Sequence, residues 1–239
     1  MRPSHLLTPV TIDTARLRDG TEFSLVRRGD TWSVRVGSMT LMTNETHASE
    51  EALAEHALAR AARLDSVLVG GLGLGFTVRA VLDRVPAATK VTTCELLPAV
   101  VDWNRRWVGE LANHPLADSR NEMVVGDVFD HIKRSSHVFD VILLDVDNGP
   151  RALSSASNQR LYGDRGIRTC FRALRPGGVL AIWSVGANAR FERALGAAGF
   201  GVEVLRVPAF RHGRKKHVLF LATVPGRDES FDVGPRGRV

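Results

Sequence analysis

The sequence predicts an α/β fold built on a mostly parallel sheet of seven strands. Between Ser66 and Ala198, apolar strand-like segments alternate with helix-like segments. This alternation is typical of parallel strands joined by helices that cover the sheet. A glycine-rich turn, Gly70 to Gly75, follows the first of these strands. Two further strands, 202–207 and 217–224, enclose a basic loop and predict an antiparallel hairpin at the end of the sheet.

A small antiparallel sheet is expected before this domain. Segments between Thr21 and Thr43 alternate in strand fashion, with turn residues at 28–30 and 37–38. We interpret this sheet as a lid or a dimer element, and we expect a homodimer. The predicted divisions are a small N-terminal β element at 1–48, the main domain at 49–225 and a disordered tail at 226–239.

A helix is predicted to lead from the small sheet into the core. Ser49 suits its N-cap, and Glu50 and Glu51 suit the positive end of the helix dipole. An apolar stripe follows at helical spacing, from Leu53 to Leu64. The later elements are strands at 66–71, 91–96, 122–126, 139–146 and 179–185, and helices at 77–85, 98–111, 165–174 and 189–198.

Two groups of residues are interpreted as core rather than as functional sites. The helix at 98–111 carries Trp103 and Trp107 on one apolar face, which we interpret as packing and not as an aromatic binding site. Cys94 and Cys170 lie far apart, without a CxxC pair or a nearby histidine at metal-ligand spacing. We therefore expect no disulfide framework and no metal site.

Composition limits the class of protein. With 239 residues, 44% hydrophobic and 24% charged, the chain is long enough to bury a substantial core. It contains no apolar run of membrane-spanning length, and its N-terminus lacks the apolar segment of a signal peptide, so we expect a cytoplasmic protein. A net charge of +6 would suit an anionic partner. Because arginine is spread along the whole chain, nucleic-acid binding is the less favoured interpretation.

The glycine turn and two acidic residues together predict a nucleoside site. Glycines at the end of a strand let the backbone bend and approach a ligand closely. Glu95 ends the next strand, twenty residues after Gly75, where a carboxylate can accept both hydroxyls of a ribose. Asp127 and Val128 follow the third strand, where a carboxylate and a backbone amide can hold an adenine ring. Either acid alone would more simply be a solvated residue at a strand end.

The fourth strand supplies the candidate catalytic acids. It ends in Asp145 and Asp147, at the edge of the sheet where ligands bind. A carboxylate there can accept a proton from an attacking amine or hydroxyl, or orient it. A loop-forming turn is the alternative interpretation, and it suits Asp147 and Asn148 better than Asp145. The only tyrosine, Tyr162, has Gly166 four residues later, so the Tyr-x-x-x-Lys pair of one class of nicotinamide dehydrogenase is missing.

From about Asp19 to Val224 the chain resembles the spermidine synthase family, the polyamine aminopropyltransferases, which share the Rossmann-like class I methyltransferase fold. The resemblance rests on the segments VLVGGLGLGFTVRAVL, TTCELLPAVVDW, VVGDVFDHI and FDVILLDVDNGP, followed by LYGDRGIRTCFRALRPGGVLAIW. It implies binding of S-adenosylmethionine or its decarboxylated form, with Glu95 on the ribose, Asp127 on the adenine and Asp145 activating the attacking amine. The complete set of expected cofactor-binding residues is Gly70, Gly71, Gly73, Leu74, Gly75, Glu95, Leu96, Asp127, Val128 and Asp145.

The resemblance also shows where this chain departs from the family. The family has an acid in place of Leu74, which holds the amino group of the aminopropyl chain. The tyrosines and glutamine that hold a diamine have no clear match between Leu41 and Glu51. The candidate substrate contacts that we name instead are His47, Glu50, Asn148 and Tyr162.

Three functions are therefore considered. The leading hypothesis is a transferase that uses S-adenosylmethionine to move a methyl group onto a small acceptor, either an amine or an anionic compound. The second is an aminopropyltransferase that uses decarboxylated S-adenosylmethionine. The third is a non-catalytic protein that keeps the nucleoside pocket and binds nucleic acid through the basic loop at 211–216.

Overall fold

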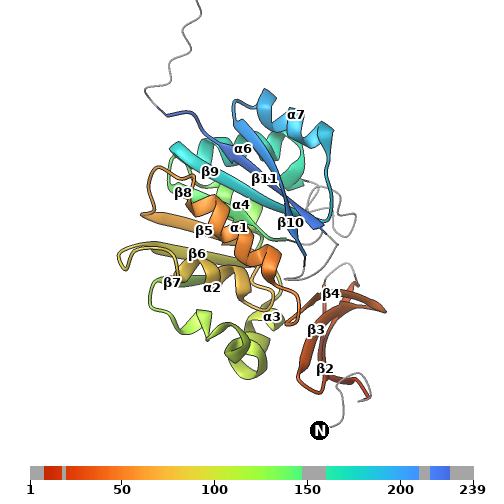
Figure 1. Ribbon diagram of the computed structural model, residues 1–239. Helices are drawn as coiled ribbons and strands as arrows, with labels where there is room; N and C mark the ends of the chain where they lie inside the picture. The colour runs from red at the N-terminus through yellow and green to blue at the C-terminus, as the bar shows by residue number, and fades with distance from the viewer. Residues whose placement is uncertain (1–7, 18–19, 147–159, 210–215, 227–239) are drawn as a thin grey trace, which may run out of the picture.

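The computed structural model describes residues 8–17, 20–146, 160–209 and 216–226. Its centre is a seven-stranded sheet in the order β10-β11-β9-β8-β5-β6-β7, as Figure 1 shows. The strands β5 to β9 run parallel, and β11 pairs antiparallel with both β9 and β10. The predicted fold class is confirmed. The strands are β5 (Ser66–Gly70), β6 (Lys90–Glu95), β7 (Asn121–Val125), β8 (Phe139–Leu144), β9 (Leu174–Ser184), β10 (Gly201–Pro208) and β11 (Lys216–Thr223).

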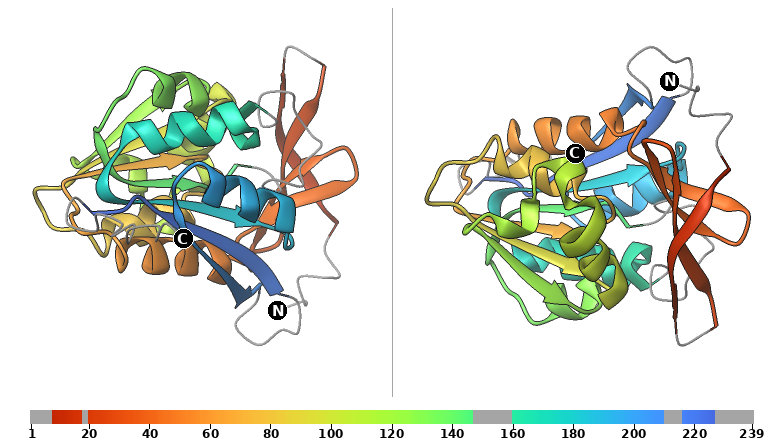
Figure 2. Two further views of the ribbon diagram at one scale, coloured as in Figure 1. Left: turned by 90° about the horizontal axis from the view of Figure 1, so that it is seen from above. Right: turned by 90° about the horizontal axis from the view of Figure 1, so that it is seen from below.

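Helices cover both faces of this sheet, as the views in Figure 2 show. On one face, α1, α2 and α3 pack against apolar side chains such as Val67 and Val69. On the other face, α4, α6 and α7 pack against side chains such as Leu68 and Leu180. Neighbouring residues of one strand thus enter different cores, as the pleat requires. The helices are α1 (Ala48–Leu58), α2 (Phe76–Leu82), α3 (Pro98–Trp103), α4 (Val128–Lys133), α6 (Asp164–Ala173) and α7 (Ala189–Ala197).

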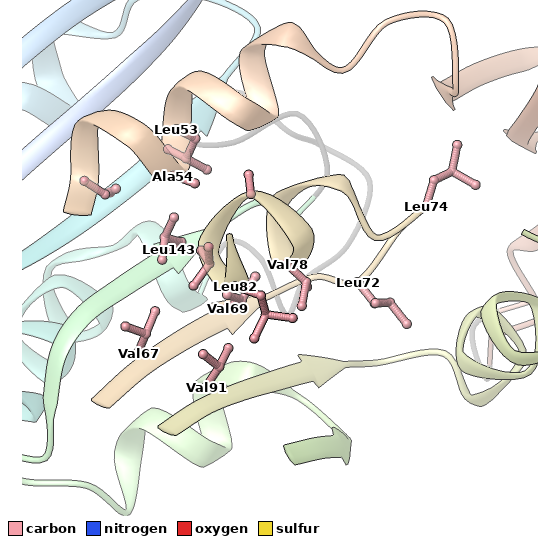
Figure 3. Packing of buried hydrophobic residues seen from close by; sticks show 14 of the residues in the cluster. Leu53, Ala54, Val67, Val69, Leu72, Leu74, Val78, Leu82, Val91 and Leu143 are labelled. Atoms are coloured by element: carbon pink, nitrogen blue, oxygen red, sulfur yellow. The ribbon is translucent and has the colours of Figure 1, made fainter. Parts of the chain in front are cut away.

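The first of these cores reaches the glycine turn. Figure 3 shows Leu53 and Ala54 of α1 above Val69 and Leu143 of the sheet, all of them buried. Leu72 and Leu74 lie on the loop beyond the end of β5 and are each 3% exposed. The turn is therefore anchored by apolar contacts as well as by its backbone.

A separate four-stranded antiparallel sheet stands at one end of the main sheet, drawn red in Figure 2. It consists of β1 (Val10–Arg16), β2 (Glu22–Arg28), β3 (Thr31–Val36) and β4 (Met39–Thr43). The strands between Thr21 and Thr43 were predicted, but β1 was missed because its polar residues hide the alternation. The indole N–H of Trp103 donates to Asp13 of β1 at 2.9 Å and ties this strand to α3.

Two local predictions are wrong, and one helix was missed. Ser49 is not the N-cap of α1, since His47 takes that position and the Ser49 hydroxyl donates to Glu50 instead. The predicted helix at 98–111 breaks after Trp103 into a π-helical turn and then a 3₁₀ turn. Asn104 gives the physical reason, because its side-chain amide also bonds the Val100 carbonyl within the helix ladder. The short helix α4 was missed.

Within the part of the chain that the structure describes, no helix is long and apolar enough to cross a membrane. The same residues contain no group of three or more His, Cys, Asp or Glu side chains that could bind a metal ion. Cys94 and Cys170 are buried, unpaired thiols, and burial raises the pKa of each to about 12. The predicted basic loop at 211–216 and the predicted tail at 226–239 lie almost entirely outside the described residues.

Candidate active site

The glycine turn is held by contacts that exclude any side chain. Gly71 has φ +94°, and a Cβ there would lie 2.2 Å from the carbonyl oxygen of Asp145. Gly73 has φ +52°, and a Cβ there would lie 2.8 Å from the sulfur of Met42 in β4. At Gly71 both the positive φ and the neighbouring backbone require glycine. At Gly73 the positive φ favours glycine, and a Cβ would have to displace the end of the Met42 side chain. The turn therefore brings the end of β8 and the N-terminal sheet close to one another.

Glu95, at the end of β6, braces this turn. Its Oε2 accepts the Leu72 N–H at 2.9 Å, and its Oε1 accepts the Leu97 N–H at 2.9 Å. Only 9% of the residue is exposed. One carboxylate therefore links the glycine turn to the segment that begins α3.

Asp127 is also engaged on two sides. Its Oδ1 accepts the Phe129 N–H at 2.8 Å, which caps α4, and its Oδ2 accepts from Arg160 at 2.9 Å. The Arg160 guanidinium lies 5.6 Å from the centre of the Phe129 ring. Asp127 thus fixes the start of α4 at the carboxyl edge of the sheet.

These groups line a first cavity between the carboxyl edge of the sheet and the N-terminal sheet. Seven of the expected cofactor-binding residues are on its wall: Gly71, Gly73, Glu95, Leu96, Asp127, Val128 and Asp145. Three others are not on this wall: Gly70 ends β5, Leu74 faces a neighbouring cavity and Gly75 precedes α2. Apolar residues of the small sheet close the other side, including Leu17, Phe23, Val34, Val36, Met39, Leu41 and Met42.

A second cavity adjoins the first. Leu41, Met42, Gly73 and Asp145 line both cavities, so these residues form their common wall. The rest of the second cavity is lined by Thr43, Glu50, Leu72, Leu74, Phe76, Thr77 and Trp183. Among these described residues, the two ionisable side chains are the carboxyls of Glu50 and Asp145.

Burial dominates the electrostatics of this pair. It raises the pKa of Asp145, while the Thr77 hydroxyl, which donates to its Oδ2 at 2.5 Å, opposes that rise. Burial, and then the charge of Asp145, raise the pKa of Glu50 from 4.5 to about 7. Two carboxyls that share a desolvated cavity resist losing both protons. The pair therefore favours either a shared proton or a bound cation.

Comparison with known proteins agrees with this architecture. The sequence model of the spermine/spermidine synthase domain matches residues 46–192. This chain belongs to that family. A polyamine aminopropyltransferase of Clostridium tetani is 32% identical over 97 residues, which cover 41% of this chain and 34% of the relative. One of Mycobacterium tuberculosis is 27% identical over 165 residues, which cover 67% of this chain and 30% of the relative. The chain thus spans about a third of the length of these curated relatives.

Solved spermidine synthases share the fold of this family member. One, in complex with the transition-state analogue AdoDATO, superposes with a TM-score of 0.75 and 19% identity, covering 89% of this chain and 73% of that one. The spermidine synthase of Thermotoga maritima superposes with a TM-score of 0.72 and 18% identity, covering 89% and 72%. At this level of identity, the likeness establishes the fold.

The structure separates the candidate substrate contacts of this synthase-family chain. Glu50 lies on the wall of the second cavity. His47 lines neither cavity, and its ring stacks on that of Phe76 with ring centres 4.1 Å apart. Tyr162 lines neither cavity and packs edge-on against Phe191 at 5.8 Å. Asp147 and Asn148 lie outside the described residues.

Sequence reasoning missed three features of the site. Thr77 holds Asp145, and Trp183, near the end of β9, closes the second cavity. Met42 packs on Gly73 from a separate sheet. The position of Trp183 at the carboxyl edge was a usable signal, since strand ends at this edge bind ligands. The contact between Met42 and Gly73 had no local signal.

Proposed function

We propose that this protein is an aminopropyltransferase, which moves the aminopropyl group of decarboxylated S-adenosylmethionine onto an amine nitrogen. The observation that carries the proposal is the junction of the two cavities at Asp145. An acid at that junction faces a nucleoside-type pocket on one side and an acidic pocket on the other. The reacting carbon and the attacking nitrogen would meet beside its carboxyl group.

The first cavity suits the adenosyl part of the sulfonium compound. Gly71 and Gly73 leave room that any side chain would fill. The carboxylate of Glu95 has about four acceptor sites, so it can hold backbone N–H groups and also accept hydroxyl groups of a ribose. Asp127 and the Val128 amide lie on the same wall, where they would hold the adenine. A spermidine synthase of this fold solved with AdoDATO supports placing the sulfonium compound here.

The second cavity suits an ammonium group with an apolar arm. Glu50 and Asp145 supply negative charge, and none of the described residues on its wall is a lysine or arginine. Leu41, Leu74, Phe76 and Trp183 would pack against methylene groups. Burial raises the pKa of Asp145, which makes its carboxylate a better proton acceptor for the attacking amine.

The relatives named polyamine aminopropyltransferases support this proposal better than the methyl transfer that the sequence alone favoured. The hypothesis of methyl transfer rested on Leu74, which stands where the family has an acid that holds the amino group of the aminopropyl chain. The structure places Leu74 beside two other carboxyls that line the same cavity, Glu50 and Asp145. The loss of one acid therefore does not leave this region without negative charge.

A product assay tests the proposal. The purified protein is incubated with decarboxylated or intact S-adenosylmethionine and with 1,4-diaminobutane or propylamine, and the products are measured by mass spectrometry. We expect methylthioadenosine and an amine enlarged by one aminopropyl group, from the decarboxylated compound only. Formation of S-adenosylhomocysteine and a methylated amine would overturn the proposal in favour of methyl transfer. Salt-dependent RNA binding with no transfer to any amine would support the non-catalytic alternative.

A further inference from the structure

Behind Glu50, two side chains from distant parts of the chain extend the site away from the cavity. The Ser49 hydroxyl donates to Glu50 Oε2 at 2.6 Å. The Nδ1 atom of His217, in β11, lies 3.0 Å from the same hydroxyl. Ser49 is 1% exposed, so its hydroxyl is a buried link between a carboxyl and an imidazole.

The hydrogen bonds of this chain allow two directions. When Glu50 is ionised, Ser49 donates to it and must accept from a protonated Nδ1 of His217. When Glu50 carries a proton, it can donate to Ser49, which then donates to an unprotonated Nδ1. The two arrangements differ by one proton moved from Glu50 to His217. No heavy atom has to move.

Burial and the neighbouring carboxyls hold a proton at Glu50, whereas the other end of this hydrogen-bond chain is open to water. Glu50 faces Asp145, just beyond the end of β8, and Glu51 from its own helix, and neither neighbour is a cation. His217 rests edge-on against Trp183 with ring centres 4.5 Å apart, and it is partly exposed beside the exposed Lys216. A proton that leaves the desolvated acidic cavity by this route thus reaches a group with access to water.

We propose that Ser49 and His217 form a proton path that carries away the proton that the acceptor amine gives up at Glu50 and Asp145. The inference rests on the proposed function and deepens it. An ammonium R–NH₃⁺ must first lose one proton to a carboxylate. The freed lone pair forms the N–C bond while the C–S bond breaks and its electron pair stays on sulfur. The sulfonium becomes a neutral thioether, the product is a secondary ammonium ion, and one proton must leave the site.

Steady-state kinetics test the path in the enzyme. We expect Ser49→Ala and His217→Asn to lower kcat for 1,4-diaminobutane on the order of tenfold to a hundredfold, less than loss of a direct base, with little change in KM. Asn keeps a group at the position of Nδ1 but cannot titrate, whereas Ser49→Thr keeps the hydroxyl and should retain activity. His137→Asn is the matched control, because His137 bonds the Leu174 carbonyl at 3.0 Å, remote from the cavities.

A second measurement does not depend on catalysis. The His217 imidazole is titrated by NMR in the protein without ligands and identified by its loss in His217→Asn. Coupled groups titrate together, so we expect its curve to change in Glu50→Gln and in Ser49→Ala. A His217 curve that neither substitution alters, or a full kcat in His217→Asn, would overturn the proton path. A wild type that transfers nothing, with the coupled titration intact, would overturn the proposed function instead.

Discussion

At the scale of single residues, Glu50 makes stability depend on pH. Its pKa is about 7 in the folded protein and would be near 4.5 in the unfolded chain. Between these values the folded state keeps a proton that the unfolded state has released. The free energy of unfolding should therefore fall as the pH rises from about 4.5 to about 7.

We predict that Glu50→Gln flattens this dependence, because the amide does not titrate. Thermal unfolding at pH 5 and pH 8 should show a smaller loss of Tm in the variant than in the wild type. Glu55→Gln, on the same helix but with an exposed carboxyl, is the control and should keep the wild-type slope. An unchanged slope in Glu50→Gln would mean that Glu50 is not the buried titrating group.

Leu74 is the residue that bears most directly on the choice of sulfonium compound. We predict that Leu74→Asp shifts the ratio of the two dissociation constants by about tenfold from the wild-type ratio, in favour of decarboxylated S-adenosylmethionine. The new carboxylate would attract the ammonium group of the decarboxylated compound and repel the carboxylate of the intact one. Leu74→Asn, of similar shape and without charge, should leave the ratio near the wild-type value. Calorimetric dissociation constants at one ionic strength decide between these outcomes. Equal ratios in the two variants would place the sulfonium side chain elsewhere.

At the scale of elements, the glycine turn and β4 support one another. Gly73→Val should abolish binding of the sulfonium compound, because it strains a positive φ and pushes Met42 off the turn. Gly37→Val is the matched control, since Gly37 has φ +56° but no atom within 4 Å of a Cβ. Calorimetry should show binding in the control and none in Gly73→Val, with both proteins folded by circular dichroism. Binding by Gly73→Val as tight as by Gly37→Val would show that the glycine turn does not hold the sulfonium compound.

At the scale of the whole molecule, β8 shows how the two edges of the sheet divide their roles. Near the start of β8, Asp140 is 2% exposed and accepts the Asp65 and Ser66 N–H groups at 2.7 and 2.9 Å. It also pairs with Arg175 at 3.0 Å. Just beyond the other end, Asp145 faces both cavities. One carboxyl joins structural elements, and the other is available to a ligand.

We predict opposite effects of the same substitution at these two positions. Asp145→Asn should lower turnover by about 10²–10⁴-fold and leave Tm nearly unchanged, because the amide accepts no proton and carries no buried charge. Asp140→Asn should cost about 1–3 kcal/mol of unfolding free energy and leave kcat near the wild-type value. Calorimetric unfolding and the product assay measure both quantities in each variant. Full turnover in Asp145→Asn would show that Asp145 does not act as the proton acceptor.

Local pattern was enough for much of the fold. Apolar strands bounded by turns predicted the seven strands of the main sheet, because burial on both faces leaves a nearly continuous apolar run. The glycine turn, Glu95 and Asp127 were predicted to lie together because the carboxyl ends of parallel strands meet at one edge, and they line one cavity. Local pattern failed where side chains interrupt a regular element, as Asn104 does after α3.

Tertiary contacts alone assembled the second cavity and the hydrogen-bond chain from Glu50 through Ser49 to His217. Ser49 and His217 are 168 residues apart, and neither position carries a periodic signal that relates it to the other. The meeting of Met42 with Gly73 likewise depends on how two separate sheets pack. Periodicity reports which face of an element is buried, whereas the partner across a packed interface is set by the joint fit of elements distant in the chain. For that reason the chain alone predicted most of the polar residues that line the first cavity, and only the folded protein revealed the acidic cavity beside it.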